Sequence, residues 1–328
     1  MLPDSSLITI GDNRSQVERF LNEIIITPRR QLKQWATITN QTPAAKVGYI
    51  GQHLASLITG VRGTRSGARG DDLADHTEVK SCSKIDQADK CKVCKSRVLR
   101  QENVCANCGS TRIERKDDSK WLFSVKSQEE LDQYLNMNRI LLIQMDYPRF
   151  KEKDFQDVRI CAFEIYPQEE RMSVFRDLIS NHYHNIYRPK ADSGAKTNPM
   201  DFHPMSFQFY KCNPIKTFEC IIKNIDTDAS IEFLRFIDPR AERNSSMETE
   251  PMPTNLLEEE EWNILLNGTS FNLLKPYILN QDITEGEFRK MSTKKKAETF
   301  PFLNEELRNM IPLREIKSST QSTQYHRT

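Results

Sequence analysis

Two acidic residues and one lysine in a short segment have the types and the spacing for metal-assisted chemistry on a phosphodiester. Residues 77–81 alternate polar and apolar side chains, which is the pattern of a half-buried strand. On such a strand Glu78 and Lys80 project from the same face, about 6–7 Å apart, while Val79 points into a core. Asp72 lies six residues before Glu78. A tight turn at the Asp-His pair before the strand would place Asp72 beside Glu78.

This predicted patch suits a hard divalent cation. Mg²⁺ takes carboxylate oxygens as ligands, and one or two such ions can stabilise the attacking and leaving oxygens of a phosphodiester. Asp72 and Glu78 are the predicted Mg²⁺ ligands, with the backbone carbonyl of Val79 completing the shell. Lys80 would position or deprotonate the attacking water, or stabilise the transition state. Asp71 is the alternative first acid, although the apolar residue that follows Asp72 favours Asp72.

The spacing of these residues resembles the PD-(D/E)XK signature of nucleases, with Asp72 as the first acid and residues 78–80 as the E-x-K. Asp71 stands where that signature has proline. The resemblance implies an α/β core of that nuclease fold. An E-x-K sequence also occurs on the solvated face of ordinary strands, so a salt-bridged strand pair without a catalytic role is the alternative.

Four of the eight cysteines form a paired C-x-x-C pattern, in which ten residues separate Cys91 and Cys94 from Cys105 and Cys108. Two such pairs supply four thiolates for a tetrahedral structural Zn²⁺ ion. A redox dithiol would need one pair, and four sulfur ligands leave no open position for a catalytic zinc. Residues 84–100 contain six basic and two acidic residues. That positive charge is compatible with a zinc ribbon that contacts DNA.

A segment rich in glycine and arginine, residues 60–70, leads directly into Asp72. Glycine lets a backbone approach a ligand closely, and arginine binds phosphate in a bidentate manner. Three arginines are therefore predicted contacts to the DNA backbone: Arg62, Arg65 and Arg69. The segment lacks the terminal Gly-Lys-Ser/Thr of a P-loop.

The composition is that of a soluble globular protein, with 328 residues, 37% hydrophobic content, 28% charged content and a net charge of +1. The length suits two domains or one domain with additions. No apolar run approaches the ~20 residues needed to cross a membrane, and residues 1–5 lack the basic start of a signal peptide. A cytoplasmic location is therefore expected. The small net charge neither favours nor excludes a nucleic-acid partner.

Hydrophobic periodicity predicts an order of helix, hairpin, strand, helix and strand, which is that of an α/β nuclease core with the zinc ribbon inserted. Gln52 and His53 on the helix before the hairpin are weak further candidates for the site. The expected elements are helices at residues 15–26, from 27–28, from 42–43 to Gly60, at 128–135 and at 168–187, and strands at 120–125, 139–145 and 158–166.

Longer runs of sequence resemble the MamI-type family of type II restriction endonucleases. The resemblance covers roughly residues 48–238. It implies Mg²⁺-dependent cleavage of both DNA strands at an interrupted palindrome with GAT and ATC half-sites, a homodimer with one half-site per subunit, and a prokaryotic host with a neighbouring DNA methyltransferase gene. The matching residues are 70–73, 77–83, the four paired cysteines, 119–125, 145–148, 180–183, 185–187, 194–199 and 206–219.

Within that resemblance, residues 187–214 are the predicted base-reading segment, because they are rich in amide, basic and aromatic side chains. Asn and Gln can pair with adenine, and Arg and Lys can pair with guanine. The candidates are Arg188, Lys190, Lys196, Asn198, Gln208, Lys211 and Asn213.

The predicted organisation has the nuclease core near its centre. Two alternative functions are a repair or modification-dependent nuclease of the same fold and a non-catalytic zinc-containing DNA-binding protein. The predicted parts are N-terminal helices at 1–42, a PD-(D/E)XK core at 43–188 with the ribbon at about 88–115, a DNA-recognition extension at 189–238, a linker at 239–254, a helical region at 255–316 and a disordered tail at 317–328.

Overall fold

The computed structural model describes residues 1–43, 45–65, 71–85, 87–243 and 247–314. Arg69 and the predicted tail at 317–328 lie outside the described residues. The chain divides into two compact units. The sheet unit is Met1–Trp121, Met137–Glu164 and Lys216–Ser246, and the helical unit is Leu122–Asn136, Ile165–Ile215 and Met247–Thr328.

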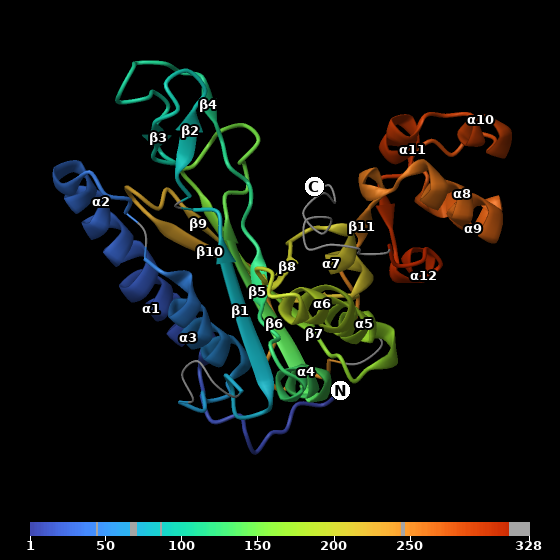
Figure 1. The fold of residues 1–328 in the computed structure, drawn as a ribbon, viewed down its shortest axis with the longest axis horizontal. Helices are drawn as coiled ribbons and strands as arrows, with labels where there is room; N and C mark the ends of the chain where they lie inside the picture. The colour runs from blue at the N-terminus through green and yellow to red at the C-terminus, as the bar shows by residue number, and fades with distance from the viewer. Residues whose placement is uncertain (44, 66–70, 86, 244–246, 315–328) are drawn as a thin grey trace. The chain divides into compact units, whose positions relative to one another are not determined.

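A five-stranded sheet forms the centre of the sheet unit, in the order β1-β6-β7-β9-β10. Strand β1 runs parallel to β6, and β9 runs antiparallel to β10, so the sheet is mixed. Every residue of β6 is buried, which fits its apolar centre, residues 140–143. The strands are β1 Thr77–Ser83, β6 Arg139–Asp146, β7 Val158–Ile165, β9 Ile215–Lys223 and β10 Ser230–Phe236 (Figure 1).

Three N-terminal helices lie along one side of this sheet (Figure 1). They are α1 Asn13–Phe20, α2 Thr27–Thr39 and α3 Val47–Thr59, with a π-helical segment, Leu21–Ile26, between the first two. Their apolar side chains pack in one core with those of the sheet, as Leu54 of α3 and Val79 of β1 do. The second helix begins at Thr27, close to the predicted start, but it continues from the π-helical segment without a break and no side chain caps it. The third ends before Gly60, whose φ of 70° suits glycine.

The starts of two helices differ from the prediction. The first begins at Asn13 and continues through a π-helical segment, and no side chain caps its start. The third begins at Val47, four residues after Pro43. Contacts with the rest of the fold accompany both starts: the side chain of Asn13 donates to the Leu57 carbonyl of α3 at 2.8 Å, and α3 packs against β1.

The ribbon follows β1 directly and has its own small sheet, in the order β3-β2-β4. The strands are β2 Asp89–Cys91, β3 Arg97–Val98 and β4 Ile113–Glu114. Cys91, Val98 and Cys105 form its buried centre. So small an apolar core cannot hold a fold by itself, which is the usual situation of a metal-stabilised module.

The helical unit contains short helices and two two-stranded sheets, β5-β8 and β11-β12. The helix expected at 168–187 is present as a 3-10 turn, Glu170–Met172, followed by a continuous helical stretch from Val174 to Asp192 that is π-helical over His182–Tyr187. The helix start predicted at Glu258–Glu261 is confirmed, with a capping box between these two residues. The elements are β5 Trp121–Phe123, α4 Gln128–Asn136, α5 Val174–Asn181, α6 Arg188–Asp192, β8 Met200–Phe202, α7 Phe207–Lys211, β11 Met252–Pro253, α8 Glu259–Gly268, α9 Phe271–Leu274, α10 Glu285–Arg289, α11 Thr293–Thr299, β12 Phe302–Leu303 and α12 Glu305–Asn309.

Among the described residues, no helix has the length and the apolar character needed to cross a membrane.

Candidate active site and metal centre

A tight turn before β1 brings the first acid to the strand, as the sequence predicted. Leu73 pairs with Thr77 in an isolated bridge, and the backbone N–H groups of Asp72 and Leu73 both donate to the Thr77 carbonyl, at 3.0 and 3.2 Å. Arg139 on β6 holds the turn, because its Nε donates to Thr77 Oγ1 at 2.9 Å and its Nη2 pairs with Asp75. The hairpin is therefore held by its own backbone hydrogen bonds and by the Arg139 side chain of β6.

The Asp72 carboxylate accepts two hydrogen bonds, one from β1 and one from α3. Its Oδ2 accepts the Val79 N–H at 2.8 Å, and its Oδ1 accepts from Gln52 Nε2 at 2.5 Å. Asp71 lies differently, with its Oδ2 2.5 Å from Nδ1 of the exposed His76. Of the two adjacent aspartates, Asp72 is thus the one that faces the strand.

Glu78 and Lys80 lie next to each other on the same face of β1, as the strand period predicts. The Glu78 residue is buried, and its Oε1 contacts the Lys80 Nζ. The Lys80 side chain keeps 24% of its surface exposed. Val79 belongs to the core on the other face. The arrangement places a buried carboxylate and a partly exposed ammonium beside Asp72.

The electrostatics of this patch are unfavourable for two ionised carboxylates. The pKa of Asp72 is raised to about 6, mainly by burial and then by the negative charge of Glu78. The Val79 N–H and the Lys80 ammonium partly offset these effects. A cation bound nearby would stabilise the ionised form of Asp72 beside Glu78.

Helix α3 adds Gln52 to the patch, and a glycine makes this possible. A Cβ on Gly51 would lie 1.8 Å from Ser81 Oγ on β1, so only glycine permits this approach of helix and strand. Gln52 therefore reaches Asp72, whereas the ring of the neighbouring His53 lies 6.2 Å from that of Phe20. Sequence reasoning gave Gln52 little weight. Its position directly after a glycine on the helix packed against β1 was the available signal.

The four paired cysteines converge on one point, as their spacing predicted. Their Sγ atoms all lie within 4.8 Å of one another, with 3.6 Å between Cys91 and Cys108 and 3.5 Å between Cys94 and Cys105. A tetrahedral zinc with Zn–S bonds of about 2.3 Å needs sulfur atoms about 3.8 Å apart. The four thiols thus have the geometry of a structural metal site.

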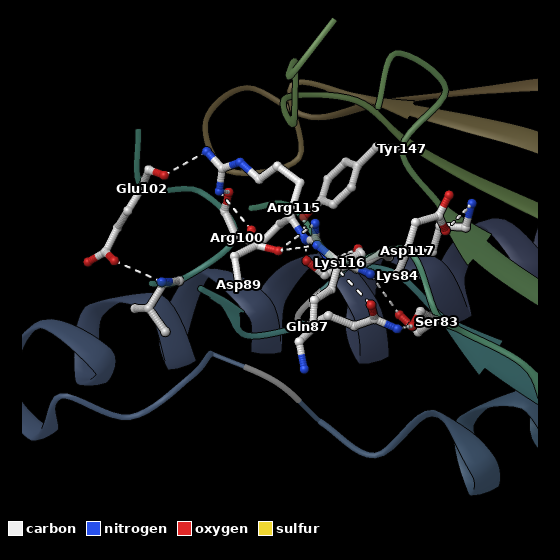
Figure 2. A network of polar contacts seen from close by, with 12 residues as sticks. Ser83, Lys84, Gln87, Asp89, Arg100, Glu102, Arg115, Lys116, Asp117 and Tyr147 are labelled. Atoms are coloured by element: carbon white, nitrogen blue, oxygen red, sulfur yellow. Dashed lines mark hydrogen bonds and ion pairs between the residues drawn. The ribbon is translucent and has the colours of Figure 1, made fainter. Parts of the chain in front are cut away.

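A buried ionic network joins the base of the ribbon to the end of β1 (Figure 2). At its centre Asp89, fully buried, contacts Arg100 at 2.9 Å and Arg115 at 2.7 Å and accepts the Lys116 N–H at 2.8 Å. Lys84, the first residue after β1, pairs with Asp117 at 2.7 Å. These contacts tie the ribbon to the strand that carries Glu78.

Comparison with known proteins places the chain in a family. A model of the MamI restriction endonuclease family matches residues 34–255, a range that includes the acidic patch and the four cysteines. The chain belongs to the MamI restriction endonuclease family. The type II restriction enzyme MamI of Microbacterium ammoniaphilum is 42% identical to it over 59 residues, which are 18% of this chain and 19% of that enzyme. The match thus spans about a fifth of the relative's length. No solved structure matches the chain.

The residues predicted to contact DNA differ in accessibility. Arg62 and Arg65 are exposed in the segment before Asp72. In the helical unit, Arg188, Lys196 and Asn198 are exposed and Lys190 is half-buried.

Gln208, Lys211 and Asn213 are instead buried. Lys211 Nζ donates to the carbonyls of Arg308, at 3.0 Å, and Ile311, at 2.6 Å. The Asn213 Oδ1 accepts from Arg308 Nε at 2.9 Å. Burial lowers the pKa of Lys211 to about 8, and the charge of Arg308 contributes. These contacts give Lys211 and Asn213 a structural role in holding α12.

Proposed function

We propose that this restriction endonuclease is a type II enzyme that hydrolyses phosphodiesters of double-stranded DNA with Mg²⁺ at Asp72, Glu78 and Lys80. The observation that carries the proposal is the hydrogen bond from the Val79 N–H to Asp72 Oδ2. It brings a carboxylate from the preceding turn beside the carboxylate and the ammonium that share one face of β1.

The residues fit a divalent cation. Asp72 and Glu78 offer oxygen ligands, and the raised pKa of Asp72 reflects a crowding of negative charge that a cation would relieve. The Val79 carbonyl and the Gln52 amide oxygen, after rotation of that amide, are further ligands. A bound Mg²⁺ would stabilise the charge on the phosphodiester and on its leaving oxygen. Asp71 is the weaker choice for first acid, because His76 occupies its carboxylate.

Lys80 acts on the attacking water and on the developing charge. Glu78 fixes the position of its ammonium, and an ammonium held in advance stabilises a charged transition state without reorganisation. The partial exposure of this side chain gives a DNA phosphate access to it.

We assign the catalytic unit to a PD-(D/E)XK core over residues 43–188, with the zinc ribbon as an insertion at about 88–115. The order of α3, the turn at Asp72, β1, α4 and β6 supports this assignment, and so does the parallel pairing of β1 with β6. The four cysteines hold Zn²⁺ as a structural ion, since all four ligand positions are taken by sulfur.

The DNA site is an interrupted palindrome with GAT and ATC half-sites, recognised by a homodimer. The exposed residues Arg62, Arg65, Arg188, Lys196 and Asn198, with the half-buried Lys190, are the proposed contacts. Phosphate contacts set the position of the protein, and contacts to base edges specify the sequence. Such an enzyme acts in the cytoplasm of a prokaryote that carries a matching DNA methyltransferase.

Digestion of unmethylated plasmid and phage DNA, with and without added Mg²⁺, tests the proposal. The wild-type protein should give discrete fragments with Mg²⁺, and mapping of their ends gives the site and the cut position. Glu78→Ala and Lys80→Ala should each lower the cleavage rate by at least ~100-fold while DNA binding and zinc content are kept. A wild-type rate in either variant would remove that residue from the site. Cleavage of methylated DNA alone would indicate a modification-dependent nuclease.

A further inference from the structure

The two cysteine knuckles of the ribbon have the same backbone geometry. The N–H of the first cysteine donates to the carbonyl five residues later, at 2.9 Å both from Cys91 and from Cys105. The N–H four residues after that cysteine donates back to the cysteine carbonyl, at 3.1 Å from Lys95 and at 2.8 Å from Gly109. Lys95 and Gly109 thus occupy equivalent positions, and their φ angles are 65° and 69°.

Glycine suits this left-handed position, and lysine does not. A residue with a Cβ pays roughly 1 kcal/mol for this conformation, whereas glycine adopts it freely. The second knuckle has the favourable residue and the first does not. Strain at a position where glycine would remove it points to a use for the side chain. The exposed Lys95 ammonium donates to the Lys92 carbonyl at 3.0 Å, and its other two protons can bond a further acceptor.

Lys95 lines a hollow of about 430 Å³ together with three other basic residues, Lys90, Arg97 and Lys116. Two acidic residues, Asp89 and Asp118, also line it. The Asp89 carboxylate is already engaged by Arg100 and Arg115, as Figure 2 shows. The hollow therefore presents mainly positive charge.

Two of these basic residues face each other across the ribbon sheet. Lys90 on β2 is paired in register with Arg97 on β3, and both side chains are exposed. Like charges directly opposite each other destabilise a strand pair. Glu114 on β4 pairs with Lys90 on its other side, but no acidic side chain of the described ribbon residues forms an ion pair with Arg97. An anion bound in the hollow would relieve this repulsion.

We infer that this hollow binds phosphates of the DNA backbone outside the phosphodiester that is cut. The inference rests on the proposed function, because it takes the ligand to be the DNA substrate. β1 carries Lys80 and ends at Ser83, so the ribbon starts about 10 Å of strand beyond the catalytic lysine. The buried network around Asp89, with the Lys84–Asp117 ion pair, ties the ribbon to the residue that follows β1. A phosphate held by the ribbon would thus help to fix the register of the duplex on β1.

Charge compensation within the ribbon is the competing explanation for these lysines. Zn²⁺ with four thiolates carries a net charge of −2, and nearby ammonium groups would stabilise it. That explanation requires the variants to lose zinc, whereas the DNA explanation requires them to keep zinc and lose DNA affinity.

The test uses the full chain with Glu78→Ala, which prevents cleavage, and a fluorescent duplex of about 30 base pairs in ~50–200 mM salt. Lys95→Gly should fold and bind zinc at least as well as its parent. It should weaken DNA binding about threefold and reduce the slope of log affinity against log salt by about 0.9. Adding Arg97→Gln and Lys116→Gln should weaken binding at least tenfold and reduce the slope further. Lys290→Gly, the same change at an exposed site of the helical unit, is the control.

Three outcomes would overturn the inference. Unchanged affinity and slope in the triple variant would show that the hollow does not contact DNA. Loss of zinc in Lys95→Gly would favour charge compensation, and an equal effect of Lys290→Gly would indicate a dependence on total charge alone. In all of these the parent still binds DNA, and the proposed nuclease function stands. A parent that binds no DNA would remove both proposals.

Discussion

Ionisation of Asp72 costs the folded protein free energy in the absence of a cation. Its pKa in the folded state is about 6, against an ordinary value of 3.8, because of burial and of the charge on Glu78. The folded state therefore holds this proton more tightly than the unfolded state. The resulting stability is fully present below about pH 4 and is lost as the pH rises through about 6.

Replacement of Asp72 by asparagine should remove this loss. Asp72→Asn should be more stable than wild type by about 1–2 kcal/mol at pH 7.5, after allowance for solvent screening of the partly exposed carboxyl, and the difference should vanish near pH 4. Added Mg²⁺ should stabilise the wild type and not the variant. Thermal unfolding at a series of pH values measures the stability difference. The samples contain no chelator, because a chelator would also remove zinc. Asp71→Asn is the matched control, and a pH-independent difference would contradict the assignment.

At the scale of elements, one contact between α3 and β1 sets the site. Gly51 packs against Ser81, and this brings Gln52 to Asp72. Gly48 lies on the same helix with nothing within 4 Å of its would-be Cβ. The two glycines therefore allow the close approach to be tested separately from the helix propensity of alanine.

Gly51→Ala should lower stability by about 1–3 kcal/mol, because helix and strand must separate, and should reduce cleavage because Gln52 moves away from Asp72. Gly48→Ala should be neutral or stabilising by up to ~1 kcal/mol. Ser81→Gly, which removes both contacting atoms, should recover part of the loss when added to Gly51→Ala. Denaturant unfolding and cleavage rates measure these effects. Equal stability of the two alanine variants would show that the approach is not close in solution.

The sequence predicted those elements whose signal is local. The alternation around Val79 predicted β1, the apolar spacing that ends at Gly60 predicted α3, and the cysteine spacing predicted the convergence of the four thiols. Helix starts were less predictable: Ser15 and Glu18 have the spacing of a capping box, but the helix begins at Asn13, whose buried side chain donates to the Leu57 carbonyl of α3. Capping is worth only about 1 kcal/mol, so tertiary contacts override it.

For the whole molecule, the features that the sequence did not predict depend on contacts between distant residues. Lys211 and Asn213 have the types of base-reading residues, yet both are buried and hydrogen-bonded to Arg308, about a hundred positions later. Side-chain type gives no sign of such a partner. The strand β9, which joins β10 to the rest of the sheet, was likewise not recognised. Long-range pairing determines these features, and a single sequence does not display it.

The proposed homodimer makes a further prediction about the whole molecule. A palindromic site bound by a two-fold dimer puts one catalytic centre at each strand, so cleavage of both strands requires two intact subunits. Wild-type protein is mixed with an excess of Glu78→Ala and allowed to exchange subunits. Most wild-type subunits then lie in mixed dimers with one active centre. On supercoiled plasmid these should accumulate nicked circles, whereas wild type alone should give linear DNA. Gel electrophoresis separates the two products. An enzyme that cuts as a monomer would be slowed by competition with the variant, and its ratio of nicked to linear product would stay that of wild type at the same active concentration.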